Sequence, residues 1–274
     1  MKKSALALVA FALAGTAFAA APVNTSTSPL AFAPEVKIAS PYTYELGLGT
    51  HRELYEEFNA DGSKLMQEEA QMTAIRGSVS RKVGDTGGTV ILSGEYAFGD
   101  STYTGAYWGG NYGDLKIKGL SRYAFDTQLT YKHTSPMWNG VSVGAGLGYR
   151  RLVDNLQEAG AGGYKRVNDR YYLALSLEKD IAIDAWTITP SAQYKHILKS
   201  NQYSDLFGGV DTAQKEGHGA EFAVAFAHKG ADYTTVITPY YRMWDIKDSE
   251  MHPLGVYEPR NKTSEAGVAL SFKF

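Results

Sequence analysis

The chain has 274 residues, of which 44% are hydrophobic and 20% are charged, and it contains 29 glycines, 19 tyrosines and no cysteine. A chain without cysteine has no disulfide, no thiolate zinc ligand and no cysteine nucleophile, and a formal net charge of −2 gives nucleic acid no net attraction. The apolar fraction is too high for a disordered chain, and the charges are spread too evenly for a bundle of transmembrane helices.

Residues 1–19 have the organisation of a secretory signal peptide. Two lysines precede an apolar run that ends at Phe18, and Ala17-Phe18-Ala19 fits the small-x-small cleavage site. The run is shorter than the about 20 apolar residues that span a bilayer. We expect cleavage after Ala19 and a flexible periplasmic lead over residues 20–40, which are rich in Ala, Pro, Ser and Thr.

From residue 41 to residue 274 the apolar residues recur with a period of two. In the last segment, Val268, Leu270, Phe272 and Phe274 alternate with small or polar residues. Because successive side chains of a strand point to opposite faces, each such segment has one apolar face and one polar face. Ten segments show this pattern: 41–51, 70–82, 88–99, 121–134, 141–153, 169–180, 186–199, 218–229, 232–245 and 263–274.

The connections between these segments alternate strictly between long and short. Transmembrane barrels have short periplasmic turns, long external loops and an even number of strands of about 9–11 residues. We therefore predict an all-β fold, a transmembrane antiparallel up-and-down β-barrel of ten strands over residues 41–274. Eight or twelve strands are the alternatives, and a soluble exported sandwich or lipocalin-like barrel is the competing class.

Two local features test this scheme. Tyrosines and tryptophans cluster at the ends of the predicted strands, where interfacial girdles of a membrane barrel would lie. Pro190 and Pro239 fall inside predicted strands, where a missing N–H interrupts the ladder. We expect both prolines at tolerated bulges or near-edge sites on the lipid face.

The C-terminal segment Ala266-Gly267-Val268-Ala269-Leu270-Ser271-Phe272-Lys273-Phe274 resembles the last strand of Gram-negative outer-membrane β-barrel proteins. This resemblance implies that Phe272 and Phe274 form the signal that the barrel-assembly machinery reads. It also implies a location in the outer membrane of a Gram-negative bacterium, with membrane lipid and lipopolysaccharide as partners.

Within that class, ten strands and five large loops are similar to the omptin-type surface proteases. Those proteases carry an aspartate pair at one rim and an Asp-His pair opposite. The second loop here, 100–120, has no close aspartate pair in the segment Phe98 to Gly105 at its start, and the fourth loop has no Asp-x-His. The resemblance therefore extends to the topology and not to the catalytic residues. His218, with Glu216, Asp205 and Asp211 in the same loop, is the best remaining acid–histidine group for a hydrolytic rim.

The polar faces of the strands are expected to line the lumen, and they carry more basic than acidic residues. Because a barrel of about eight strands can be filled by its own side chains, these charges either plug the lumen as paired ions or line a narrow pore that favours small anions. The predicted lumen residues are Glu45, Arg76, Glu95, Asp126, Arg150, Arg170, Glu178, Lys195, Glu221 and Arg242.

The loops are the best candidates for a partner site. The second loop is rich in aromatic residues, and rigid rings supply contact area at a low entropy cost. The first loop, 52–69, is acidic, and we expect a solvated loop. The predicted binding residues of the second loop are Tyr103, Tyr107, Trp108 and Tyr112.

The sequence predicts no catalytic residue, no metal site and no cofactor, because the six histidines show no ligand spacing and no G-x-S-x-G occurs. The expected function is non-enzymatic: a narrow pore that passes small ions, or a surface-exposed interaction protein that binds a surface ligand and no nucleic acid. The alternative is an omptin-like rim hydrolase with a divergent site.

Overall fold

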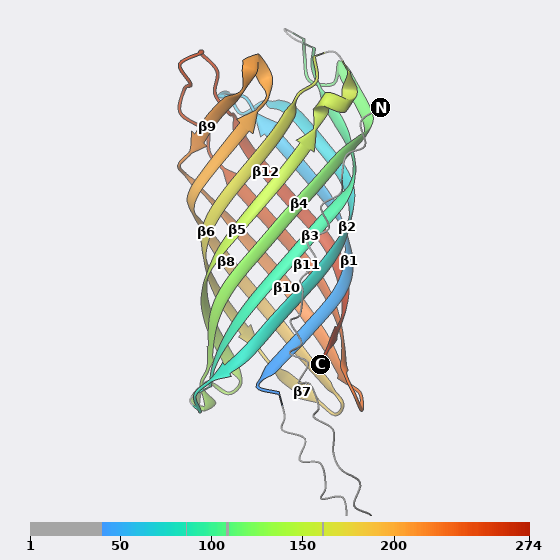
Figure 1. The fold of residues 1–274 in the computed structure, drawn as a ribbon, viewed down its shortest axis with the longest axis vertical. Coiled ribbons are helices and arrows are strands. Elements are labelled where there is room, and N and C mark those ends of the chain that lie inside the picture. The colour runs from blue at the N-terminus through green and yellow to red at the C-terminus, as the bar shows by residue number, and fades with distance from the viewer. Residues whose placement is uncertain (1–39, 86, 108–109, 161) are drawn as a thin grey trace, which may run out of the picture. The chain divides into compact units, whose positions relative to one another are not determined.

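The computed structural model of the chain describes residues 40–85, 87–107, 110–160 and 162–274. Ten long strands form one closed antiparallel barrel in which each strand pairs with its neighbours along the chain, and β1 pairs with β12 (Figure 1). These strands are β1 (Tyr42–Phe58), β2 (Lys64–Val83), β3 (Gly88–Gly105), β4 (Leu115–Thr134), β5 (Val141–Asn155), β6 (Lys165–Lys179), β8 (Trp186–Ser204), β10 (Gly217–Lys229), β11 (Thr234–Ile246) and β12 (Arg260–Lys273). The prediction of a ten-stranded up-and-down barrel is confirmed.

Two short strands extend the barrel at opposite ends. β7 (Ile181–Ile183) pairs with the first residues of β8 beside a short turn. β9 (Val210–Gln214) pairs with the last five residues of β8, beyond the part that β10 covers. Three short 3-10 turns complete the described elements: η1 (Pro136–Trp138), η2 (Leu156–Ala159) and η3 (Leu206–Gly208).

The strands are longer than predicted at the long-loop end. β1 continues to Phe58 and β2 already begins at Lys64, so most of the predicted first loop is strand. The prediction of a solvated acidic loop over 52–69 is therefore wrong. The reason is that charged residues lie on both faces there and break the apolar alternation. Arg52 and Glu69 lie outside and form an ion pair of 2.8 Å, while Glu53 and Glu68 point inward and are buried. A strand with charged residues on both faces gives no unbroken hydrophobic alternation for the sequence to show.

The short turns lie at the other end of the barrel, together with its C-terminus (Figure 1). The turn between β4 and β5 is built by η1, where the Ser135 hydroxyl accepts from the Met137 amide and Asn139 adopts a left-handed conformation with φ 49°. At the same end, Phe274 and Tyr44 exchange two backbone hydrogen bonds of 2.9 and 3.1 Å. This exchange closes the seam between the last strand and the first.

Each proline lies at a gap in one of its two ladders while the other ladder continues through it, which is neither the bulge nor the near-edge site that the sequence predicts. The β6–β8 pairing ends at Ser191, and the β7–β8 pairing begins at Ile188, so Pro190 lies between them. The β10–β11 pairing has a gap between Tyr240 and Ile237, and this gap contains Pro239. Both side chains face outward. A residue without an N–H is tolerated at such positions because no ladder bond is lost.

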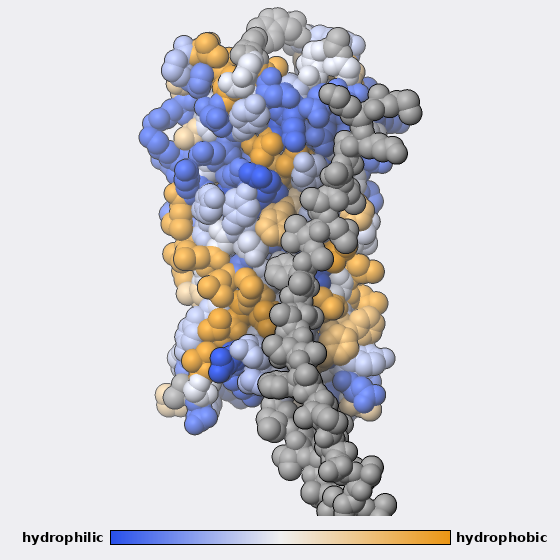
Figure 2. Space-filling model, in the orientation of Figure 1, coloured by the Kyte–Doolittle hydropathy of each residue, from blue (hydrophilic) through white to orange (hydrophobic). Residues whose placement is uncertain are grey.

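The outer face of the barrel is divided into an apolar belt and a polar collar. Figure 2 shows apolar side chains gathered toward the short-turn half and polar side chains above them. On β5 the outward residues change from Leu147, which is 60% exposed, to the charged Arg151 four positions further along the strand. The strands of up to 20 residues exceed the about 9–11 that cross a bilayer, so the barrel projects beyond the apolar belt at its long-loop end.

Aromatic side chains border the belt on both sides. On β4, Tyr131 lies near the short-turn border and Tyr123 near the other, eight residues or ~27 Å apart along the tilted strand. Tyr149 and Tyr171 extend the second girdle, with ring centroids 5.0 Å apart. The described residues include no helix long and apolar enough to cross a membrane.

Candidate functional site in the barrel interior

The lumen at the long-loop end is filled by buried ion pairs, and Arg122 on β4 is central to them. Its guanidinium binds Glu53 on β1, Glu68 on β2 at 2.8 Å and Asp154 on β5. The side chains of all four residues are at most 1% exposed. Four strands are therefore joined through one arginine.

Three further buried arginines have the same kind of environment, each with three carboxylate partners within 4 Å. Arg166 and Arg150 share partners with Arg122, which makes the ion pairs one continuous network. The contacts are Arg166 with Glu57, Glu68 and Asp154, Arg150 with Glu53, Asp126 and Glu265, and Arg242 with Glu95, Glu221 and Glu265.

Aromatic and aliphatic side chains pack around this arginine–carboxylate network. The ring of Tyr55 lies 5.2 Å from the guanidinium of Arg122 and 4.8 Å from that of Arg166, in the arrangement of a cation–π contact. Tyr55 also belongs to a buried apolar cluster with Met72 and Leu152. Charges removed from water must be paired and hydrogen-bonded to avoid a large desolvation cost. The network and its apolar packing fill the lumen around Arg122 and Arg166.

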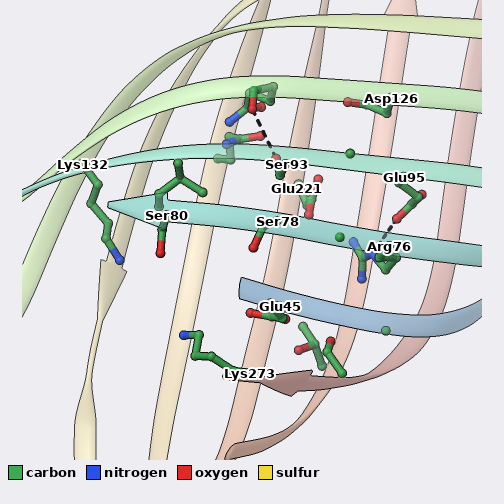
Figure 3. Close-up of a pocket in the computed structure, with 18 of the residues that line it drawn as sticks. Glu45, Arg76, Ser78, Ser80, Ser93, Glu95, Asp126, Lys132, Glu221 and Lys273 are labelled. Atoms are coloured by element: carbon green, nitrogen blue, oxygen red, sulfur yellow. Dashed lines mark hydrogen bonds and ion pairs between the residues drawn. The ribbon is translucent and has the colours of Figure 1, made fainter. Parts of the chain in front are cut away.

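Below the network, toward the short turns, the lumen opens into a polar cavity of about 410 Å³. Figure 3 shows Arg76, Glu95 and Asp126 at one end of this cavity and Lys132 at the other. Arg76 pairs with Glu95 at 2.6 Å, and Lys195 pairs with Glu221 at 2.9 Å. These pairs form the boundary between the cavity and the network above it.

The sequence-derived lumen residues occupy three places in the structure. Arg150 and Arg170 are buried at the level of the network. Glu178 forms a 2.5 Å ion pair with Lys132 near the short-turn end. The others line the cavity: Glu45, Arg76, Glu95, Asp126, Lys195, Glu221 and Arg242.

Sequence reasoning missed much of the acidic half of the network. The expected excess of basic groups in the lumen is wrong, because further buried residues add one arginine and five carboxylates: Arg166, Glu53, Glu57, Glu68, Asp154 and Glu265. Glu53, Tyr55 and Glu57 continue the inward phase of Glu45 and Gly47 on the same strand. This unbroken two-residue alternation is the sequence signal from which these inward residues of β1 could have been predicted.

One predicted inward base is turned outward. The two-residue alternation from Lys195 within the predicted strand 186–199 places Lys199 in the lumen, but the β6–β8 pairing passes from Tyr171–Lys199 to Tyr172–Ile197 and so skips Leu198. The extra residue reverses the alternation, and Lys199 is exposed while Ser200 is buried.

His51 is buried between two carboxylates of the lumen. Its Nδ1 lies 3.0 Å from the Tyr240 hydroxyl, and one of its ring nitrogens and single oxygens of Glu95 and Glu265 all lie within 4.8 Å of one another. The two carboxylates already bind Arg76, Arg150 and Arg242. Three guanidinium charges around the group oppose the binding of a divalent cation.

The acid–histidine group suggested for a hydrolytic rim does not assemble. The ring of His218 stacks on Tyr194 at 6.3 Å, and Tyr194 is 48% exposed on the outer face of the barrel. Asp205 instead accepts a hydrogen bond of 2.6 Å from the backbone amide of Lys165. Asp211 points outward from β9.

The aromatic residues of the second loop separate into two groups. Tyr107 and Tyr112 are exposed in the loop 106–114, and Lys64 lies 5.6 Å above the Tyr112 ring. Tyr103 belongs to β3 and packs against the buried apolar cluster of the lumen. Trp108 lies outside the described residues.

The fifth loop, 247–259, inserts a carboxyl group into the mouth of the barrel. Glu258 is buried, and the Tyr55 hydroxyl donates to both Glu57, at 2.9 Å, and Glu258, at 3.4 Å. Burial, with the neighbouring Glu57 carboxylate, raises the pKa of Glu258 to about 8. The backbone of Glu258 also bonds Ser249, which fixes the two ends of the loop to each other.

A closed antiparallel barrel with an apolar belt, aromatic borders, short turns at one end and long loops at the other is the fold of Gram-negative outer-membrane β-barrel proteins. The sequence matches no protein-family profile and no curated protein.

Among solved structures, the chain is similar to the outer membrane protease OmpT from Escherichia coli. The TM-score is 0.50 at 11% identity, over 85% of this chain and 96% of OmpT. It also resembles the β domain of the Bordetella autotransporter BrkA, with a TM-score of 0.41 at 11% identity over 84% and 99% of the two chains. For the outer membrane protein OprG from Pseudomonas aeruginosa, the TM-score is 0.38 at 13% identity, over 85% of this chain and 95% of OprG. The likeness to OmpT supports the omptin-like topology and concerns the fold alone.

Proposed function

We propose that the protein is an integral outer-membrane β-barrel that does not conduct ions and that binds a partner at the cell surface through its second and fifth loops. The observation that carries this proposal is the arginine–carboxylate network across the lumen. Of the two non-enzymatic functions that the sequence suggests, a pore and a surface interaction protein, the network favours the second.

The network opposes conduction because it leaves no mobile charge and little room. Arg122 is bound to three carboxylates from three other strands, and its side chain has no exposed surface. To pass an ion, this cross-link would have to break and leave charges buried without partners. The cavity beneath it reaches only the short-turn half of the lumen, as its lining residues show.

The second and fifth loops expose apolar side chains at the long-loop end. In the second loop, the Gly110 amide bonds the Tyr107 carbonyl and the Gly113 amide bonds the Gly105 carbonyl. In the fifth loop, His252 and Gly255 close a turn with φ 77° at the glycine. Loops that are held by their own hydrogen bonds lose less entropy on binding. Among the described residues of these two loops, the exposed apolar side chains include Tyr107, Tyr112, Met251, Leu254 and Tyr257.

The location and the partners of assembly belong to the same proposal. A signal peptide over residues 1–19, which lie outside the described residues, would export the chain. Phe272 and Phe274 point outward beside Tyr233 at the short-turn end, where the assembly machinery could read them. Lipopolysaccharide would surround the polar collar, and the long loops would then face the exterior.

Binding by folded protein in nanodiscs to arrays of immobilised glycans and proteins tests the proposal. Replacing Tyr107, Tyr112, Met251 and Leu254 by serine should reduce retention at least tenfold. Met137→Ser is the matched control, because Met137 is 88% exposed in a short turn at the opposite end, and it should leave binding unchanged. Equal binding by both variants, or absence of binding by the natural chain, would contradict the proposal. Cleavage of peptides by the folded protein would favour a rim hydrolase instead.

A further inference from the structure

Arg170 on β6 differs from the other arginines that are buried in the lumen. Arg122, Arg150, Arg166 and Arg242 each have three carboxylate partners within 4 Å, whereas among the described residues Arg170 has none. Arg170 is nevertheless only 1% exposed. A buried guanidinium carries its full charge, because arginine does not lose its proton in proteins.

The contacts of Arg170 leave most of its donors without acceptors. Its Nη2 donates to Asn261 Oδ1 at 3.0 Å, and its guanidinium carbon lies 5.9 Å from the centre of the Trp244 ring. Nε and Nη1 have no acceptor among the described residues. Trp244 and Asn261 lie on β11 and β12, so the arginine side chain reaches across the lumen from β6.

The side chains that Arg170 contacts, and their cross-strand partners, carry further donors without partners, while Asn168 on the same face of β6 has both an unpartnered donor and an unpartnered acceptor. Trp244 Nε1, Asn261 Nδ2 and the Thr263 hydroxyl are buried and lack partners in the described structure. Thr263 is the cross-strand partner of Trp244, and Ser200, whose hydroxyl is likewise unpartnered, is the cross-strand partner of Arg170. A buried group of N–H and O–H donors around one cation is complementary to an anion.

The nearest acidic group of the fifth loop does not supply the missing charge. Glu258 hydrogen-bonds Tyr55 and forms no ion pair within the described part of the chain. Because the pKa of Glu258 is raised to about 8, its carboxyl group is mainly protonated at neutral pH. Among the described residues, the Arg170 guanidinium therefore lacks the directly paired carboxylates that the other buried arginines of the lumen have.

We propose that Arg170, Trp244, Asn261 and Thr263 bind a small monovalent anion, a halide or a carboxylate such as formate, inside the barrel. One negative charge balances one guanidinium, and the donors of these four residues supply the ligand contacts. The anion takes the part that three carboxylates take at each of the other buried arginines. The site is independent of any partner that the loops bind.

Anomalous diffraction from crystals of the natural chain soaked in sodium bromide tests the site directly. We expect a bromide peak within 4 Å of the Arg170 guanidinium. A soak in sodium formate should place planar density at the same position, and competition between the two salts separates a halide site from a carboxylate site. Crystals in which only water lies beside Arg170 at high bromide and at high formate would overturn the proposal.

The second measurement is urea unfolding in lipid vesicles at constant ionic strength, in sodium chloride, sodium formate and sodium gluconate. The unfolding midpoint of the natural chain should be higher in chloride or formate than in gluconate, and the gain should saturate with concentration. Arg170→Met should abolish this difference, and Thr263→Val, which keeps the arginine, should weaken it. Arg52→Met is the matched control at an exposed ion pair and should keep the natural anion dependence. Equal anion dependence in R170M and the natural chain would contradict the site.

Discussion

At the scale of single residues, replacing an arginine inside the barrel leaves buried carboxylates without a partner, whereas replacing an exterior arginine leaves a solvent-exposed carboxylate. Replacing Arg122 by methionine would leave Glu53, Glu68 and Asp154 buried without their shared partner. Breaking a buried pair in this way costs about 3–5 kcal/mol. Replacing Arg52 removes a pair with Glu69 whose side chains are 69% and 41% exposed, and such pairs contribute less than about 1 kcal/mol.

We therefore expect R122M to lower the free energy of unfolding by about 3–5 kcal/mol and R52M to change it by less than about 1 kcal/mol. Urea unfolding in lipid vesicles, followed by tryptophan fluorescence, measures both. If the two variants were equally stable, the network would not be the stabilising element of the lumen.

Glu258 predicts a pH dependence for the fifth loop. Its pKa is raised from 4.5 to about 8, so the folded loop binds more protons than the detached loop between these values. The contribution of Glu258 to stability is complete below about pH 4.5 and is lost as the pH rises to about 8. Local opening of the loop should increase by up to about tenfold per pH unit in this window.

Hydrogen exchange of the Ser249 and Glu258 amides, corrected for intrinsic rates, checks this expectation. Glu258→Gln mimics the protonated form and should abolish the pH dependence between pH 5 and pH 8 while keeping the loop closed. Asp61, in the turn between β1 and β2, has a pKa lowered by its hydrogen bonds to Ser63, so Asp61→Asn should leave the fifth loop unaffected. A pH profile that persists in E258Q would assign the effect to another group.

At the scale of elements, each strand has to satisfy two environments along its length. On β5, Leu147 faces the apolar belt and Arg151 faces the polar collar, on the same side of the strand. Arginine on the lipid face costs about 2–4 kcal/mol at the bilayer midplane and little near the interfaces. We expect L147R to lose about 2–4 kcal/mol of unfolding free energy.

The matched substitution on the same strand is Arg151→Leu, which should change the free energy of unfolding by less than about 1 kcal/mol through the loss of the exposed pair with Asp169. Urea titration of both variants in vesicles of one lipid composition gives the comparison. If L147R and the natural chain had equal free energies of unfolding, Leu147 would not lie in the apolar belt.

The same division of the strands explains which elements the sequence could predict. Within the apolar belt, the two-residue period of segments such as 141–153 and 263–274 located the strands correctly, because lipid demands apolar outward residues. Above the belt, β1 beyond His51 and β2 before Ala70 carry charged residues on both faces, which interrupt the apolar alternation. The hydrophobic signal ends there although the ladder continues, so the strands were predicted too short.

The charged interior was only partly predictable for a related reason. Glu45, Arg76 and Arg150 could be assigned to the lumen because apolar neighbours fixed their phase. Glu68 and Asp154 could not, because nothing in their local sequence separates a solvated loop from a buried network. Their partners lie on distant strands, and Arg166 contacts Glu57 across 109 positions of the chain. Only the closure of the barrel brings such residues together.

At the scale of the whole molecule, the barrel consists of a sealed half and an open half. The network closes the lumen at the long-loop end, and the polar cavity of about 410 Å³ lies toward the short turns. The exposed loops are then the part of the molecule that meets the exterior. This arrangement makes the closed lumen the central claim about function.

Conductance across a planar lipid bilayer tests that claim most directly. The mature chain would be refolded in detergent, its folding shown by a heat-dependent shift in gel mobility, and its current recorded at several voltages in potassium chloride. The arginine–carboxylate network predicts no discrete current steps from folded protein. Reproducible steps of one unitary conductance from the natural chain would show an open lumen and would contradict the account.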